Sequence, residues 1–233
     1  LYESPTSRTE TFAPLEAFKP VSDSELLSPP PEDWLHWRGN TGSWGYSPLE
    51  QISTRNVEDL ELAWVWQMEV DELRGWQGPL VRNGVLFLSN PRNIIQALDG
   101  TNGTLLWEYQ RQFPGDDSGI NLRTLAIWED LIFVATRDAY LVALDARTGV
   151  LRWETQLADS RQGYTNSTGP IVADGKVING INGCQRFFEE TCFITAHDAR
   201  TGVELWRTYT VAQPGEPGGD TWGDLPVELR GGG

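Results

Sequence analysis

The sequence predicts an all-β fold, a β-propeller, and three observations lead to this prediction. One spaced pattern, Ala-x-Asp-x-x-x-Gly-x-x-x-Trp, occurs three times, at residues 97–107, 143–153 and 196–206. The copies recur at intervals of about 46 to 53 residues, close to the length of one four-stranded propeller blade. β-Branched and aromatic runs bounded by Gly, Pro, Asn and Asp precede each copy, as expected of short strands joined by tight turns.

Each repeat is expected to form four strands in chain order. In the first repeat, about residues 79–107, apolar runs predict strands at 80–81, 85–88, 94–98 and 105–109. The turn that follows the third strand ends in Gly103, which suits a left-handed position of a short hairpin loop. The second repeat, about 124–153, and the third, about 169–206, have the same plan. The Trp that ends each repeat is expected to pack between neighbouring blades. An open sandwich that reuses one hairpin is the alternative.

The third repeat carries an insertion at residues 182–192 that the other two lack, and it contains both cysteines of the chain, Cys184 and Cys192. Their placement favours a disulfide across the neck of a hairpin, and therefore an oxidising compartment. Two buried free thiols are the alternative. A metal pair is disfavoured, because the only histidines, His36 and His197, are far apart in the sequence.

Composition and length limit the function and the domain organisation. The chain has 233 residues and a net charge of −15, which argues against a nucleic-acid-binding surface. No apolar run approaches the roughly 20 residues of a membrane span. Residues 1–33, rich in Ser, Thr, Pro and Glu, are expected to be a flexible leader, and 34–233 to be part of the propeller. Three blades cannot close a ring, so we expect the chain to be a fragment.

Several motifs together resemble a known family, the quinoprotein alcohol dehydrogenases that use pyrroloquinoline quinone (PQQ). The similarity covers about 200 residues from Trp34 onward. It rests on the three Trp repeats and on the following segments: Trp37-Arg38-Gly39-Asn40, residues 46–52, Asn56-Val57, Leu62-Ala63-Trp64, residues 78–81, residues 136–146 and residues 214–223.

The resemblance implies an eight-bladed propeller with PQQ near its axis, beside calcium or another divalent or lanthanide ion. In such an enzyme the metal polarises the quinone carbonyl, and hydride passes from a small primary alcohol to the quinone. Electrons then leave to a cytochrome c, and the location is the periplasm. The catalytic Asp of the family would lie beyond Gly233, so no catalytic residue is assigned in this chain.

The resemblance also implies binding residues, position by position. Arg123 matches an arginine that contacts a PQQ carboxylate, and Ser167, or Thr168 in the neighbouring register, matches a hydroxyl that binds the cofactor. The loop Asn182-Gly183-Cys184 matches one that lies against PQQ.

The sequence departs from the family pattern at three places, one of which is residues 116–119, where no Cys occurs although many family members have adjacent cysteines there. Gln77, or Trp76 beside it, stands where a Glu near PQQ is usual, and Gln185 stands at the position of the metal-binding Glu. A neutral amide oxygen can bind calcium but offsets none of its charge.

Two further functions remain open. One is a non-catalytic propeller that serves as a scaffold or assembly protein of the outer envelope, and the other is a quinoprotein-like fold that has lost its metal.

Two other features of the sequence are interpreted as structural. His197 occupies the repeat position of Leu98 and Leu144 and is expected to be a partly buried strand residue. The acidic pair Asp116-Asp117 is expected to be a solvated turn.

Overall fold

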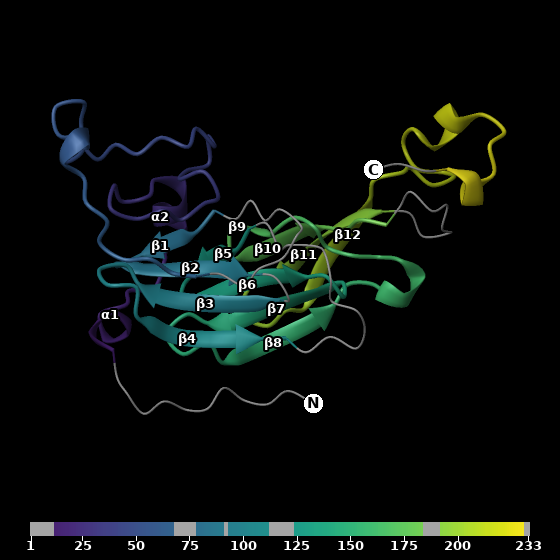
Figure 1. Cartoon of the computed structure of the whole chain (residues 1–233). Helices are drawn as coiled ribbons and strands as arrows, with labels where there is room; N and C mark the ends of the chain where they lie inside the picture. The colour runs from purple at the N-terminus through teal and green to yellow at the C-terminus, as the bar shows by residue number, and fades with distance from the viewer. Residues whose placement is uncertain (1–11, 68–77, 91–92, 112–123, 184–191, 231–233) are drawn as a thin grey trace.

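The computed structural model describes residues 12–67, 78–90, 93–111, 124–183 and 192–230 and contains three four-stranded antiparallel sheets in chain order (Figure 1). In each sheet every strand pairs with the next one along the chain. The prediction of an all-β fold with three four-stranded repeats is therefore confirmed. The strands of blade 1 are β1 (Leu80–Arg82), β2 (Val85–Asn90), β3 (Ile94–Asp99) and β4 (Leu105–Gln110). Those of blade 2 are β5 (Ala126–Trp128), β6 (Leu131–Thr136), β7 (Tyr140–Asp145) and β8 (Leu151–Gln156). Those of blade 3 are β9 (Ile171–Ala173), β10 (Lys176–Gly180), β11 (Phe193–Asp198) and β12 (Glu204–Tyr209).

Helices are few and short in the described part of the chain. They are α1 (Ala13–Glu16), α2 (Asp23–Leu27) and the 3₁₀ turns Val57–Asp59, Ser160–Gln162, Gly219–Trp222 and Val227–Leu229. Among the described residues, none of these helices has the length and apolar character needed to cross a membrane.

The repeated pattern has a local structural cause. The register between the third and fourth strands shifts directly after the Ala of the pattern, between Ala97 and Leu98 in blade 1, with the same bulge in blades 2 and 3. The Asp that follows closes the turn: Asp99 accepts the backbone N–H of Thr101 at 2.8 Å and, through its own carbonyl, that of Gly103 at 2.8 Å. Gly103 has φ +74°, which explains the Gly of the pattern.

The tryptophans of the pattern join one blade to the next. Trp107 donates its indole N–H to the carbonyl of Ala146 at 2.9 Å, and Trp153 donates to that of Ala199 at 3.0 Å. The indole ring covers the turn glycine of the next blade, so that a Cβ on Gly149 would lie 2.6 Å from the ring of Trp107. Close packing between these two positions thus requires both the Trp and the Gly.

Trp64 makes the same contact with blade 1 from outside the three sheets. Its indole N–H donates to the carbonyl of Gly100 at 3.1 Å, and a Cβ on Gly103 would lie 2.7 Å from its ring. Trp64 thus occupies the place of the last-strand Trp of a preceding blade. At the other end of the series, Trp206 is 41% exposed, whereas Trp107 is 7% exposed.

The described part of the leader, residues 12–33, packs against blades 1 and 2. Phe18 and Val21 are buried, and Val21 forms an isolated bridge with Glu129 of blade 2. Phe18 meets Phe87 of β2 edge to face, with ring centroids 6.2 Å apart. A few apolar side chains of the segment pack against blades 1 and 2. The amino-acid composition of the segment does not reveal this packing.

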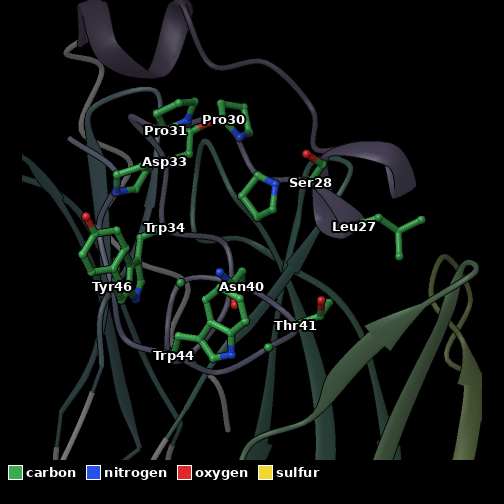
Figure 2. Close-up of a pocket in the computed structure, with 14 residues that line it drawn as sticks. Leu27, Ser28, Pro30, Pro31, Asp33, Trp34, Asn40, Thr41, Trp44 and Tyr46 are labelled. Atoms are coloured by element: carbon green, nitrogen blue, oxygen red, sulfur yellow. The ribbon is translucent and has the colours of Figure 1, made fainter. Parts of the chain in front are cut away.

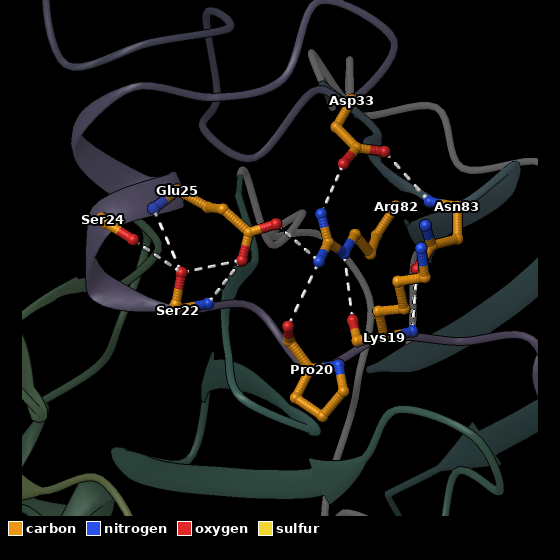
Figure 3. A network of polar contacts seen from close by, with 8 residues as sticks. All are labelled: Lys19, Pro20, Ser22, Ser24, Glu25, Asp33, Arg82 and Asn83. Atoms are coloured by element: carbon orange, nitrogen blue, oxygen red, sulfur yellow. Dashed lines mark hydrogen bonds and ion pairs between the residues drawn. The ribbon is translucent and has the colours of Figure 1, made fainter.

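A buried ion-pair network fixes the same segment to blade 1 (Figure 3). Arg82 of β1 pairs with Asp33 at 2.6 Å and with Glu25 of α2 at 2.7 Å. The guanidinium also donates to the carbonyls of Lys19 at 3.0 Å and Pro20 at 3.1 Å. The side chains of Arg82 and Asp33 are almost fully buried, and the ion pair replaces contacts that water would otherwise make with the two groups.

Candidate functional site

The predicted binding residues share one topological position. Each precedes the first strand of a blade or lies between its second and third strands. In an antiparallel meander these connections fall at the same end of the sheet, which is also the end where one blade continues into the next. We call it the interblade end. The turns that receive the Trp side chains lie at the opposite end.

Two of the predicted residues, Ser167 and Asn182, are in contact at the interblade end. Thr165 and Asn182 form an isolated antiparallel bridge, with N–H to carbonyl distances of 3.1 and 2.9 Å. The bridge places the side-chain amide of Asn182 against Ser167, and Asn182 Nδ2 donates to Ser167 Oγ. Ser167 is half-buried and Asn182 is exposed, so both polar groups border solvent. Thr168, the alternative to Ser167, is exposed.

The segment that carries Ser167 also lies against the start of blade 2. A Cβ on Gly169 would stand 1.9 Å from Thr124 Oγ1 and 2.1 Å from the Thr124 carbonyl oxygen, so only Gly fits there. Thr124 directly follows Arg123 in the chain. Arg123 itself lies outside the described residues, as do Gln77, Trp76, Cys184 and Gln185.

Gly183 has a structural role that the sequence did not reveal. Its φ is +117°, and a Cβ there would lie 2.7 Å from the carbonyl oxygen of Gly163 and 3.0 Å from Tyr164 Cα. The glycine is therefore required by the backbone of the preceding segment, whereas the resemblance suggested close approach to a cofactor. Both requirements concern the same loop and are compatible.

Two buried asparagines beneath Ser167 and Asn182 were not predicted. Asn166 Nδ2 donates to the carbonyl of Thr136 at 2.8 Å and to that of Tyr140 at 3.2 Å. Its Oδ1 accepts from Asn179 Nδ2 at 2.9 Å. In β10, Asn179 occupies the register position that Val134 holds in blade 2, and this replacement of an apolar residue was a signal available in the sequence.

A charged group at the interblade end is Arg111, directly after β4. It pairs with Asp138 at 2.8 Å and with Glu154, and it stacks on the ring of Tyr140 at 4.3 Å. Burial opposes its charge, but the two carboxylates outweigh burial and raise the pKa of Arg111. Arg111 thereby joins the end of blade 1 to blade 2.

The two histidines have structural environments. His197 is fully buried in β11, more than the partial burial expected, and its Nδ1 lies 3.1 Å from the carbonyl oxygen of Gly202. Burial lowers its pKa. His36, for which the sequence showed no partner, contacts the Leu26 carbonyl through Nε2 at 2.7 Å. Among the described residues, no three His, Cys, Asp or Glu side chains gather to hold a metal ion.

One cavity, of about 430 Å³, lies away from the interblade residues (Figure 2). Its lining includes Trp34, Trp44, Tyr46 and the prolines Pro29–Pro31. The predicted binding residues that the structure describes, Ser167, Asn182 and Gly183, are not among its lining residues. Figure 2 shows that the leader and the segment after it enclose it between them.

Comparison with known proteins shows to which protein family the chain belongs. The family model for the β-propeller domain of glucose, ethanol and alcohol dehydrogenases, named for PQQ, matches residues 34–228. The chain belongs to this family. The quinohemoprotein alcohol dehydrogenase ADH-IIG of Pseudomonas putida is 36% identical over 223 residues, which cover 87% of this chain and 30% of that protein. The dehydrogenase subunit of a quinone-dependent alcohol dehydrogenase of Gluconobacter oxydans is 39% identical, over 79% of this chain and 25% of that protein.

Solved structures of the family agree with the fold. The chain superimposes on quinohemoprotein alcohol dehydrogenase ADHIIG from Pseudomonas putida with a TM-score of 0.76 and 32% identity, over 87% of this chain and 31% of that chain. A europium-containing methanol dehydrogenase gives a TM-score of 0.72 and 31% identity, over 81% of this chain and 34% of that chain. The chain thus spans about a third or less of these relatives.

The described residues of this family member fit part of a PQQ site. A hydroxyl at Ser167, an amide at Asn182 and the bare backbone at Gly183 stand together at the interblade end, bordering solvent. Such groups can donate hydrogen bonds to the carboxylates of a flat cofactor. They contribute no carboxylate of their own, so a metal ion would need ligands from elsewhere.

Proposed function

We propose that this chain forms part of a PQQ-dependent dehydrogenase that oxidises a small primary alcohol. When bound, PQQ accepts the hydride of the alcohol and the metal ion polarises its reactive carbonyl. In this proposal Ser167, Asn182 and the backbone of Gly183 hold and orient the cofactor at the interblade end. Arg123, Gln77 and Cys184 are proposed to extend the same site.

The observation that carries the proposal is the meeting of Ser167 and Asn182. They are 15 residues apart in the chain, and the resemblance to the family assigns both to the cofactor. Gly169, two residues after Ser167, packs on Thr124, which is the residue that follows Arg123 in the chain. Two stretches that match cofactor-binding segments of the family, around Ser167 and around Asn182, therefore meet at the interblade end, and Thr124 of blade 2 packs beside the first of them.

The remaining parts of the proposal concern the metal, the electron acceptor and the compartment. Calcium or a lanthanide is proposed as the ion, with Gln185 as one ligand; europium in a related methanol dehydrogenase supports the wider choice. A cytochrome c is proposed as acceptor, in line with the quinohemoproteins among the relatives. Cys192 is buried and is not a free thiol, which supports a Cys184–Cys192 bridge and a periplasmic location.

The test is dye-coupled oxidation of ethanol by the whole protein that contains this chain, after removal and stepwise addition of PQQ and of calcium or a lanthanide. We expect activity only when both PQQ and a metal ion are present. PQQ binding without activity under any metal would support instead the propeller that has lost its metal. Absence of PQQ binding would support the scaffold function, which the comparisons do not favour.

A further inference from the structure

The buried amides of Asn166 and Asn179 connect three segments at the interblade end. Asn166 is 0% exposed and Asn179 is 3% exposed. Asn166 uses both N–H groups on carbonyls of the β6–β7 turn and its Oδ1 on Asn179. Because two carbonyl oxygens face Nδ2, the orientation of the Asn166 amide is determined by its partners.

Asn166 directly precedes Ser167 in the chain, and Asn179 lies three residues before Asn182, and we assign both Ser167 and Asn182 to the cofactor. Asn166 is flanked by Thr165, which bridges to Asn182, and by Ser167, which accepts from the Asn182 amide. Asn179 is the fourth residue of β10 and pairs in register with Thr195 of β11, and the chain continues from β10 to Asn182 and Gly183. The Asn166–Asn179 hydrogen bond therefore joins the segment that carries Ser167 to the strand that leads to Asn182.

An Asn at position 179 is expected to stabilise the buried strand β10 less than an apolar residue would. Val134 fills the equivalent position of blade 2 with an apolar side chain. Asn179 Oδ1, in contrast, is buried and has no hydrogen-bond partner among the described residues. A buried unpaired carbonyl group is destabilising, so the amide is best explained by the bond that it donates to Asn166.

We propose that Asn166 and Asn179 are positioning residues: their buried hydrogen bond sets the distance and orientation between Ser167 and Asn182. The proposal deepens the proposed function and rests on it for the role of those two groups toward PQQ. The positioning itself concerns only this chain and can be measured without the cofactor.

The test compares Asn179→Val with the wild type in the whole protein. Val restores the side chain of blade 2 and removes the unpaired Asn179 Oδ1, but it leaves Asn166 Oδ1 without its donor. One unpaired buried oxygen thus replaces another, so the thermal unfolding midpoint should stay close to that of the wild type. Hydrogen exchange of peptides covering 164–169 and 178–183 should become faster in the apoprotein, because the Thr165–Asn182 bridge loses its support. PQQ should bind about five- to tenfold more weakly, as for loss of one aligned hydrogen bond.

Two further variants make the result specific. Asn166→Asp keeps the shape but replaces the amide donor to Thr136 and Tyr140, and it should weaken PQQ binding at least as much as Asn179→Val. Thr155→Val is the matched control. It removes the 2.8 Å hydrogen bond from Thr155 Oγ1 of β8 to the carbonyl of Gly202, which joins the same two blades through the turn between β11 and β12. It should leave the exchange of both peptides and the PQQ affinity unchanged.

The outcomes separate the two proposals. Two results would overturn the positioning role. One is hydrogen exchange in Asn179→Val that is unchanged from the wild type. The other is a loss of PQQ affinity that merely parallels a loss of stability and that Thr155→Val shows to the same extent. Faster exchange in a protein whose wild type binds no PQQ would leave the positioning standing and reject the proposed function. Combining Asn179→Val with Ser167→Ala should give less than additive losses of affinity, because both changes act on one contact.

Discussion

The packing of Trp107 on Gly149 predicts a large difference between two Gly→Ala substitutions. Gly149 has φ +70° and Gly84 has φ +76°, so an added Cβ strains the backbone at both sites by about 1–2 kcal/mol. At Gly84 nothing lies within 4 Å of the new Cβ, whereas at Gly149 the Trp107 ring lies at 2.6 Å. Overpacking of this kind adds about 1–3 kcal/mol.

Gly149→Ala should therefore lower the free energy of unfolding by about 2–5 kcal/mol, and Gly84→Ala by about 1–2 kcal/mol. Equilibrium urea unfolding of each variant, followed by tryptophan fluorescence, measures the difference. The 2.9 Å bond from Trp107 to the Ala146 carbonyl should also lengthen, which a shift in the emission of the folded variant would report. Equal destabilisation by the two substitutions would refute the inference that the Trp107 ring packs closely on Gly149.

Further predictions concern the ends of the described chain and its buried charges. Trp107→Ala should cost about 3–5 kcal/mol of stability and Trp206→Ala about 1 kcal/mol in this chain, because Trp206 is already 41% exposed; urea titration compares them. Asp33→Asn should cost about 1–3 kcal/mol, since it weakens a bond to buried Arg82, and should speed proteolysis within residues 12–33. Burial holds the pKa of His197 below its unfolded value, so stability present above about pH 6.5 should decline as the pH falls below it. His197→Leu, the residue of the other blades, should reduce that decline in a pH series of unfolding midpoints.

The repeat architecture could be predicted because its causes are local and periodic. Asp99 accepts a hydrogen bond within its own turn, and Gly103 provides the positive φ that the turn requires, so the residues that determine each turn lie within the repeated pattern. The docking of Trp107 on the next blade could be expected from its size, although its partner, the Ala146 carbonyl, was visible only in the structure.

The leader and the buried asparagines could not be predicted, because their partners are distant in the chain. Arg82 lies 49 residues from Asp33, and no composition rule links the two. Asn166 and Asn179 are 13 residues apart, and the strand register around β10 brings them together. Ser167 was assigned by resemblance alone, and the structure adds its contact with Asn182.

The central claim is that the interblade end of blades 2 and 3 forms one side of a PQQ site. Titration of the whole apoprotein with PQQ in the presence of calcium or a lanthanide, followed by the absorbance of the bound quinone, tests it most directly. The account predicts saturable binding with one PQQ per protein, weakened about tenfold by Ser167→Ala as one hydrogen bond to a charged carboxylate is lost. Wild-type protein that binds no PQQ, or a Ser167→Ala variant that binds it with wild-type affinity, would contradict the account.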